Sequence, residues 1–259
     1  MYRWHHESNF YTPWVPQMTA ASQAAFRRAV ESIESAYADL GHSIGWRFLC
    51  VSESVLNSDP HIVMLTANPG GNSIPKHHPT ASCESGCAYR VETWGTSATG
   101  VHKLQIQVQR LFDAISEVST AGLTTDGSRL MEQSLIGYFI PFRSPRLKLL
   151  HRPKESLAFA KQLWAEMLQI VHPRLFIALD PAAYTGINDA CEAIGGVHVS
   201  SEAVPTGWGN VTAEIDEFKY PDRSVMTLRL PHLSTFQLFS RPECLPHVRE
   251  ILMKACRYL

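Results

Sequence analysis

The segment His61-Ile62-Val63-Met64-Leu65-Thr66-Ala67-Asn68-Pro69-Gly70-Gly71-Asn72 joins a short apolar run to a sharp turn. An apolar run of this length that ends in Asn, Pro and Gly is typical of a buried strand followed by a loop. Similar apolar runs recur at 135–140, 174–179 and 225–230. The sequence therefore predicts four core strands, each with a loop at its carboxyl end.

Helical patterns separate these strands. Apolar residues recur at helical spacing over 19–40, 101–118, 154–171, 182–194 and 245–259. Alternating strands and helices predict an α/β fold, which we expect to be a three-layer α/β/α sandwich around a mostly parallel four-stranded sheet. Because no repeat or linker interrupts the chain, we expect a single domain over 1–259, with an irregular arm at 1–16 and loops at 74–100 and 196–222.

The composition is that of an ordinary globular protein. Of the 259 residues 45% are hydrophobic and 18% are charged, and the formal net charge is -1. No apolar run approaches the roughly 18 residues that span a bilayer, and the amino-terminal residues lack the pattern of a secretory signal. We expect a cytoplasmic, monomeric protein without membrane contact, whose six cysteines are reduced thiols. Any nucleic-acid contact must then come from a local basic patch.

Several well-known catalytic motifs are absent. The chain has no G-x-x-x-x-G-K-[ST] phosphate loop, no G-x-G-x-x-G and no H-E-x-x-H, and the near match to a nucleophile elbow at 95–99 follows no evident strand. Polar residues instead follow the first and last strands, as Asn68 to Ser73 and as His232 with Ser234. Because carboxyl ends of parallel strands meet at one edge of a sheet, these residues form the candidate site.

These segments resemble motifs of the uracil-DNA glycosylase superfamily. The first resembles the G-I-N-P-G motif of the mismatch-specific branch, and the last resembles an H-P-S motif in which Leu233 replaces the proline. Between them, 139–145 resembles the family's loop with proline and arginine, and 172–180 resembles its P-x-h-I-h-A-L-G strand, where h is hydrophobic. Together the four segments span 62–236, which is most of the chain.

The resemblance implies a monofunctional DNA glycosylase without a cofactor. Asn68 would position the attacking water, and its neutral amide would orient that water without removing a full proton. His232 would donate a hydrogen bond to the departing base as negative charge accumulates there. Hydrolysis of the N-glycosidic bond would leave an abasic site in DNA.

Further residues would hold the DNA. The target base must leave the helix, and Phe236 stands where many relatives carry a leucine that fills the gap. The backbone of the first loop and two serines would bind phosphates, and these residues are Pro69, Gly70, Gly71, Ser73 and Ser234. A loop without acidic residues before Glu155 supplies the local positive charge through Arg143, Arg146 and Lys148, with Arg152 and Lys154 behind them. The partner would be double-stranded or single-stranded DNA.

The base itself is less clearly indicated. Relatives that recognise uracil usually carry an asparagine where this chain has Tyr138 and Phe139. An aromatic residue there suggests stacking or a differently shaped pocket, which favours a modified pyrimidine. Our narrower hypothesis is a bulky modified cytosine, such as the hydroxymethyl or glucosyl-hydroxymethyl cytosine of phage DNA, with a role in antiviral defence. The alternatives are excision of uracil or mismatched thymine in repair, and a glycosylase fold that binds DNA or modified bases without cleavage.

A zinc site is a further possibility. His77, His78, Cys83 and Cys87 stand close together in one polar segment. Their irregular spacing favours a chance cluster, so we predict no metal. The four-cysteine spacing of an iron-sulfur cluster is also missing from the sequence.

Overall fold

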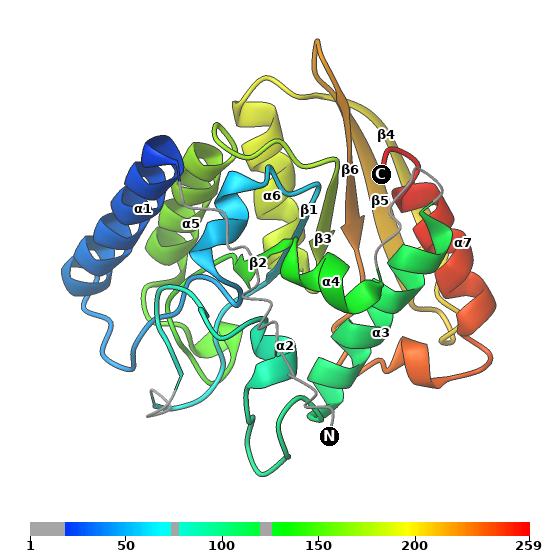
Figure 1. Ribbon diagram of the computed structural model, residues 1–259, viewed down its shortest axis with the longest axis horizontal. Coiled ribbons are helices and arrows are strands. Elements are labelled where there is room, and N and C mark those ends of the chain that lie inside the picture. Colours follow the sequence, from blue (N-terminus) through cyan, green and yellow to red (C-terminus); the bar gives the residue numbers. More distant parts are fainter. Residues whose placement is uncertain (1–18, 74–77, 120–125) are drawn as a thin grey trace, which may run out of the picture.

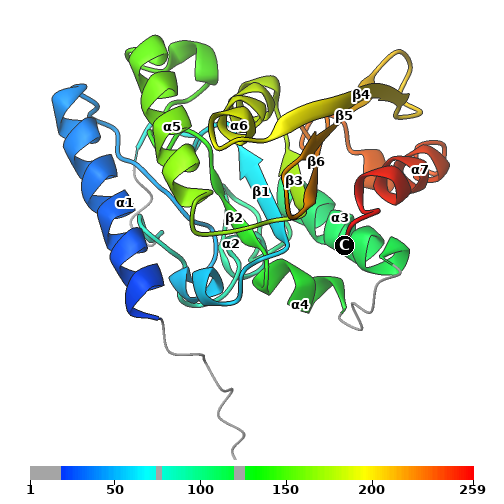
Figure 2. The same cartoon turned by 90° about the horizontal axis from the view of Figure 1, so that it is seen from above.

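The sheet of the protein lies between two layers of helices in a computed structural model that describes residues 19–73, 78–119 and 126–259. Figures 1 and 2 show helices α1, α5 and α6 on one face and α3, α4 and α7 on the other. This arrangement confirms the expected α/β class and its three layers. The predicted arm at 1–16 lies outside the described residues.

Four parallel strands form one side of the sheet. They are β1 (Ile62–Thr66), β2 (Leu135–Tyr138), β3 (Leu175–Ala178) and β6 (Ser224–Arg229), which lie in the order β2-β1-β3-β6. Every residue of β1 and β3 is buried, as expected for strands covered on both faces. All four lie within the predicted runs or one residue beyond them.

The prediction of a four-stranded sheet is wrong, because two further strands continue it. β5 (Thr212–Lys219) pairs antiparallel with β6, and β4 (Val197–Pro205) pairs antiparallel with β5 at the outer edge. The ladder between β4 and β5 is irregular between His198 and Ser200. Over the described residues the sheet is therefore six-stranded and mixed.

The helices follow the predicted pattern closely. The long ones are α1 (Ala20–Asp39), α3 (Lys103–Val118), α5 (Pro153–Met167), α6 (Pro181–Ala193) and α7 (Leu245–Ala255). Thr19 caps α1 by accepting a hydrogen bond from the backbone of Ser22, and α5 begins with proline at its first turn. Two short helices were not predicted, α2 (Ala88–Val91) and α4 (Gly127–Glu132). Short 3-10 helices occur at Glu53–Asn57 (η1), Leu147–Leu149 (η2) and Leu238–Ser240 (η3).

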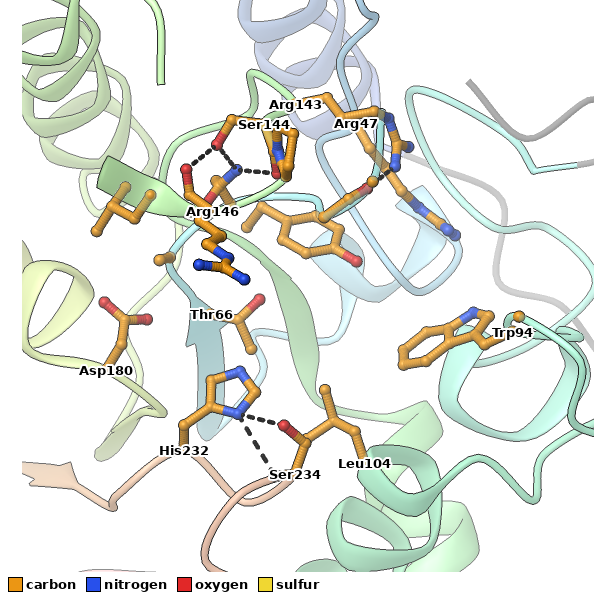
Figure 3. Close-up of a pocket in the computed structure, with 18 of the residues that line it drawn as sticks. Arg47, Thr66, Trp94, Leu104, Arg143, Ser144, Arg146, Asp180, His232 and Ser234 are labelled. Carbon is orange, nitrogen blue, oxygen red and sulfur yellow. Dashed lines mark hydrogen bonds between the residues drawn. The ribbon is translucent and has the colours of Figure 1, made fainter. Parts of the chain in front are cut away.

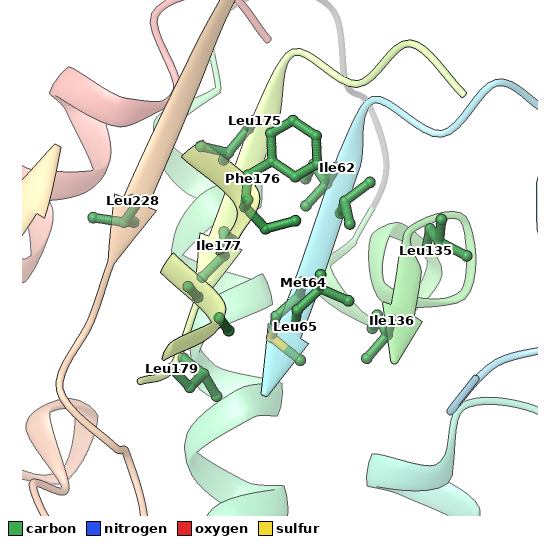
Figure 4. Close-up of a cluster of buried hydrophobic side chains, with 14 of the residues drawn as sticks. Ile62, Met64, Leu65, Leu135, Ile136, Leu175, Phe176, Ile177, Leu179 and Leu228 are labelled. Carbon is green, nitrogen blue, oxygen red and sulfur yellow. The ribbon is translucent and has the colours of Figure 1, made fainter. Parts of the chain in front are cut away.

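The apolar core fills both sides of the parallel strands. Figure 4 shows side chains of β1, β2, β3 and β6 that are almost entirely buried, among them Ile62, Met64, Leu135, Phe176, Ile177 and Leu228. No helix within the described residues has the length and apolar character needed to cross a bilayer. All six cysteines are free and buried.

Phe139 belongs to this core. Its side chain is fully buried, and its ring packs against Gly186 of α6 so closely that a methyl group there would clash with it. The indole of Trp164 also donates a hydrogen bond to the Phe139 carbonyl at 3.0 Å. The prediction that Phe139 contacts the substrate is therefore wrong, because the residue after Tyr138 faces the opposite side of the chain.

Candidate functional site

A cavity of about 730 Å³ opens at the carboxyl edge of the parallel strands. The loops after β1, β3 and β6 supply Asn68, Asp180 and His232 to its walls, and the last residue of β2 supplies Tyr138. Figure 3 shows Asp180 and His232 toward one end of the cavity and Trp94 toward the other. The cavity thus lies where parallel α/β sheets commonly bind ligands, and it contains both residues predicted as catalytic.

The amide of Asn68 has a fixed orientation. Its nitrogen donates to the Pro69 carbonyl at 3.0 Å and to the Ser144 hydroxyl at 2.9 Å, and it lies 3.4 Å from the Phe142 carbonyl. Ser144 is itself fixed, because it is buried and donates to the Arg146 carbonyl. Since the nitrogen faces these acceptors, the amide oxygen of Asn68 is left to accept a hydrogen bond from a ligand or water.

His232 is held by Ser234 in one tautomer. The backbone N–H of Ser234 donates to Nδ1 of His232, and the Ser234 hydroxyl lies 2.8 Å from the same atom. Because Nδ1 accepts, the proton of the neutral ring is on Nε2. The His232 side chain is exposed to the cavity, but the protein atoms around the ring partly desolvate it and so lower its pKa, as does the positive charge of Lys103. Both effects favour the neutral ring, which donates through Nε2.

Aromatic rings line the far end of the cavity. The rings of Tyr89 and Trp94 meet edge to face with centroids 5.0 Å apart, and Tyr138 lines the same cavity. The indole N–H of Trp94 donates to Glu92 at 2.8 Å, which fixes the ring. His78 and His102 also line this end. The surface combines aromatic faces with hydrogen-bonding groups, which suits a ligand that is both flat and polar.

A buried ion pair supports the aromatic end. Both terminal nitrogens of Arg47 donate to the two carboxylate oxygens of Glu92, at 2.8 and 2.6 Å. Burial alone raises the pKa of Glu92, but the hydrogen bonds and charge of Arg47 outweigh it and lower the pKa. A bidentate pair of this kind is rigid, so it holds Trp94 in place.

Asp180 is a site residue that we did not predict. It lines the cavity directly after β3 and caps α6 through one oxygen, which accepts from the Ala183 N–H at 2.9 Å. Its other oxygen is buried without a hydrogen-bond partner among the described residues. Burial raises the pKa of Asp180 to about 6, although nearby backbone N–H groups, including that of Ala67, oppose the rise.

The structure gathers most of the predicted binding residues at this cavity. Besides Asn68, Tyr138 and His232, its lining includes Gly70, Gly71, Ser73, Arg143, Arg146 and Ser234. Pro69 is buried behind the lining, where its carbonyl accepts from Asn68 and from the Ser144 backbone. Lys148 is exposed in η2 and lies outside the cavity lining.

Phe236 also lies outside the cavity lining. Its half-buried ring packs edge to face against Trp208, with centroids 5.7 Å apart. The guanidinium of Arg241 stacks on the indole of Trp208, 3.6 Å from the centroid of that ring. Phe236 is thus part of a surface cluster close in sequence to His232.

The possible zinc ligands are not arranged as a metal site in the described part of the chain. Cys83 and Cys87 are buried, and burial raises the pKa of both thiols. His78 lies 3.1 Å from the Thr93 carbonyl and 3.5 Å from Glu92. His77 is outside the described residues, and the remaining His, Cys, Asp and Glu side chains form no group of three that would hold a metal.

Sequence reasoning missed four residues of this region, and only one of them has a recognisable signal in the sequence. Asp180 follows a predicted strand directly, so the rule that selected Asn68 and His232 selects it as well. Arg47, Glu92 and Trp94 come from irregular segments without a periodic pattern. Only the fold brings Arg47 and Trp94 to the cavity wall, where Glu92 binds both of them.

Comparison with known proteins adds no assignment. The chain matches no family model, and no curated protein is similar to it in sequence.

Proposed function

We propose that this chain is a monofunctional DNA glycosylase that hydrolyses the N-glycosidic bond of a flipped-out pyrimidine. The observation that carries the proposal is that Asn68 and His232, which resemble the two catalytic residues of the uracil-DNA glycosylase superfamily, line one cavity with opposite hydrogen-bonding roles. Asn68 offers an acceptor, and His232 offers a donor. A base-sugar bond that breaks with charge separation needs both.

The reaction assigns one task to each residue. As the bond between C1′ and the base nitrogen breaks, its electron pair goes to the base, and Nε2–H of His232 stabilises the charge on the base carbonyl. The sugar becomes positive at C1′, and the water whose O–H is held by the Asn68 oxygen adds there. The proton that this water loses ends on the departing base or in solvent, so the products are the free base and an abasic site. No residue forms a covalent bond to the sugar.

The cavity favours a modified base over plain uracil. Tyr138 stands where relatives that read uracil carry an amide, and the cavity continues past it to Tyr89 and Trp94. Its volume of about 730 Å³ is in the range of pockets for drug-sized ligands, which exceeds what one pyrimidine fills. A cytosine with a bulky polar substituent, such as a glucosylated hydroxymethyl group, fits these features and would give the protein a role against phage DNA.

The proposal is tested by incubating the protein with oligonucleotides that contain uracil, mismatched thymine, hydroxymethylcytosine or its glucosylated form. Alkali-labile abasic sites are then measured for the wild type, Asn68→Ala and His232→Ala. We expect cleavage on a modified cytosine and its loss in both variants. Binding without abasic sites on every substrate contradicts the proposal and indicates a protein that only binds DNA or bases. Cleavage that survives in both variants contradicts the assigned roles.

A further inference from the structure

Arg143 is a buried arginine without a carboxylate partner. Its side chain is about 7% exposed, and it lines the cavity beside the loop of Asn68. Nη1 donates to the Gly70 carbonyl, while Nε is buried without a hydrogen-bond partner. Among the described residues no Asp or Glu lies within ion-pair distance of Arg143. Burying a charge in this way is costly unless something neutralises it.

Glu92 acts electrostatically on Arg143 but cannot neutralise it. Both oxygens of Glu92 are occupied by Arg47, and Trp94 donates to one of them as well. Burial lowers the pKa of Arg143, and the positive charge of Arg47 acts in the same direction. The cavity wall therefore carries one arginine whose charge is balanced and one whose charge is not.

The loop that carries Asn68 runs directly beside Arg143. Gly71 has a φ of +95°, and a side chain there would come within about 3.6 Å of Nη1 of Arg143. The Asn68 amide binds the Phe142 carbonyl and the Ser144 hydroxyl, which flank Arg143 in sequence. If water held by Asn68 attacks a sugar, the groups attached to that sugar lie close to Arg143.

The chemistry of the substrate identifies the missing anion. Uracil, thymine and the modified cytosines are neutral before the bond breaks, whereas each nucleotide of DNA carries a permanently charged phosphate next to its sugar. Arginine binds phosphate through strong, charge-assisted hydrogen bonds, and these strengthen in a site shielded from water. A phosphate is therefore the group that neutralises Arg143 when substrate is bound.

We infer that Arg143 is the anion-binding residue of the cavity and holds a phosphate of the flipped nucleotide beside the Asn68 loop. The identity of the nucleotide rests on the proposed glycosylase function, but the anion site does not. Arg143 then differs from the exposed Arg146 and Lys148, since it binds the target nucleotide itself instead of the flanking backbone.

The test compares nucleosides with nucleotides. Calorimetry measures how deoxycytidine and its 3′- and 5′-monophosphates bind to the wild type, Arg143→Gln, Arg143→Lys and Arg249→Gln, an exposed arginine on α7. We expect the wild type to bind at least one monophosphate about tenfold more tightly than the nucleoside, the strength of a charge-assisted contact. The preference should disappear in Arg143→Gln, persist in part in Arg143→Lys and remain in Arg249→Gln. A wild type without preference, or a preference kept in Arg143→Gln, overturns the inference.

A second measurement needs no variant. Inorganic phosphate should compete with the bound monophosphate in the wild type and leave nucleoside binding unchanged, and absence of this competition also overturns the inference. Excision on oligonucleotides is measured separately. Excision by a protein without phosphate preference overturns the role of Arg143 alone, whereas a preference that depends on Arg143, with no excision of any base, overturns the proposed glycosylase alone.

Discussion

Arg47 and Arg143 are buried arginines on the wall of the same cavity, and they differ in what balances their charge. Arg47 meets both oxygens of Glu92, whereas within the described part of the chain Arg143 has only the Gly70 carbonyl and a buried Nε without a partner. The aromatic end is therefore complete without a ligand, and the end at Asn68 is not. This contrast indicates that the wall with Arg47 and Glu92 maintains the shape of the cavity, while the wall with Asn68 and Arg143 is prepared for substrate.

The largest expected effect is on the rate of base excision, at the wall with Asn68 and Arg143. Asn68→Ala removes the amide that holds water, and we expect the single-turnover rate of base excision to fall by about 10²–10⁴-fold. The hydrogen bonds to Pro69 and Ser144 are also lost, at a cost of about 1–2 kcal/mol in unfolding free energy. Quench-flow kinetics and urea denaturation measure the two effects. A large loss of stability with an unchanged rate would place Asn68 on the structural side of the comparison.

The next largest effect is on the free energy of unfolding, at the wall with Arg47 and Glu92. Arg47→Met leaves the Glu92 carboxylate buried without its cation, and we expect the free energy of unfolding to fall by about 3–5 kcal/mol. Glu92→Gln added to this variant should restore part of the loss, because the uncompensated charge is then gone. Urea denaturation of both variants checks this. A loss below about 1 kcal/mol in the single variant would show that the pair does not maintain the cavity.

Asp180 gives a pH-dependent effect of intermediate size. Its folded pKa of about 6 is raised above the usual value of 3.8, so the folded state holds the proton more tightly than the unfolded chain. Stability from this group is present below pH 3.8 and is lost as pH rises toward 6. Asp180→Asn keeps the cap of α6 and removes the charge, so we expect a gain of about 1–3 kcal/mol at pH 7.

The measurement for Asp180→Asn is urea denaturation at acidic and neutral pH. The gain over the wild type should vanish near pH 4, where the wild-type carboxyl is protonated in the folded state. A gain of the same size at both pH values would show that another property of the amide is responsible.

The smallest effect is expected at Arg143. Arg143→Met removes the bond to Gly70 but also removes an unbalanced buried charge, so the unfolding free energy should change by no more than about 1 kcal/mol. Thermal unfolding next to Arg47→Met checks the contrast. If Arg143→Met is as destabilising as Arg47→Met, the two walls do not differ in how their charges are balanced.

The central fold was predictable because its signal is local. Strands β1, β2, β3 and β6 are apolar runs, and their carboxyl ends led to Asn68 and His232 without knowledge of the fold. β5 was not predictable in this way, because it buries Asp216 and Glu217, which usually mark a surface. Asn188 donates to one oxygen of Asp216, and Arg257 with Tyr258 donates to both oxygens of Glu217. These partners come from distant parts of the chain, so no local pattern shows them.

The candidate site was predictable in part for the same reason. Asn68 and His232 were found because they follow strands, whereas Asp180 follows a strand and was missed. Phe139 was wrongly assigned because sequence does not show which side of a loop faces the cavity. The Arg47–Glu92 pair joins residues 45 positions apart in the sequence, so its existence depends on packing. Phe236 and Lys148 were placed in the right loops but outside the cavity lining.

The outermost strand has a consequence for self-association. Among the described residues no strand pairs with the outer edge of β4, and nearly all of its side chains are exposed. Such an edge is a template on which other strands can add. Three features of β4 oppose that addition. Its pairing is irregular near Val199, it ends in Pro205, and Glu202 carries a charge that pairs with Lys254 of α7. The sheet is thereby closed to further growth on this side, which protects the protein from aggregation through its own edge.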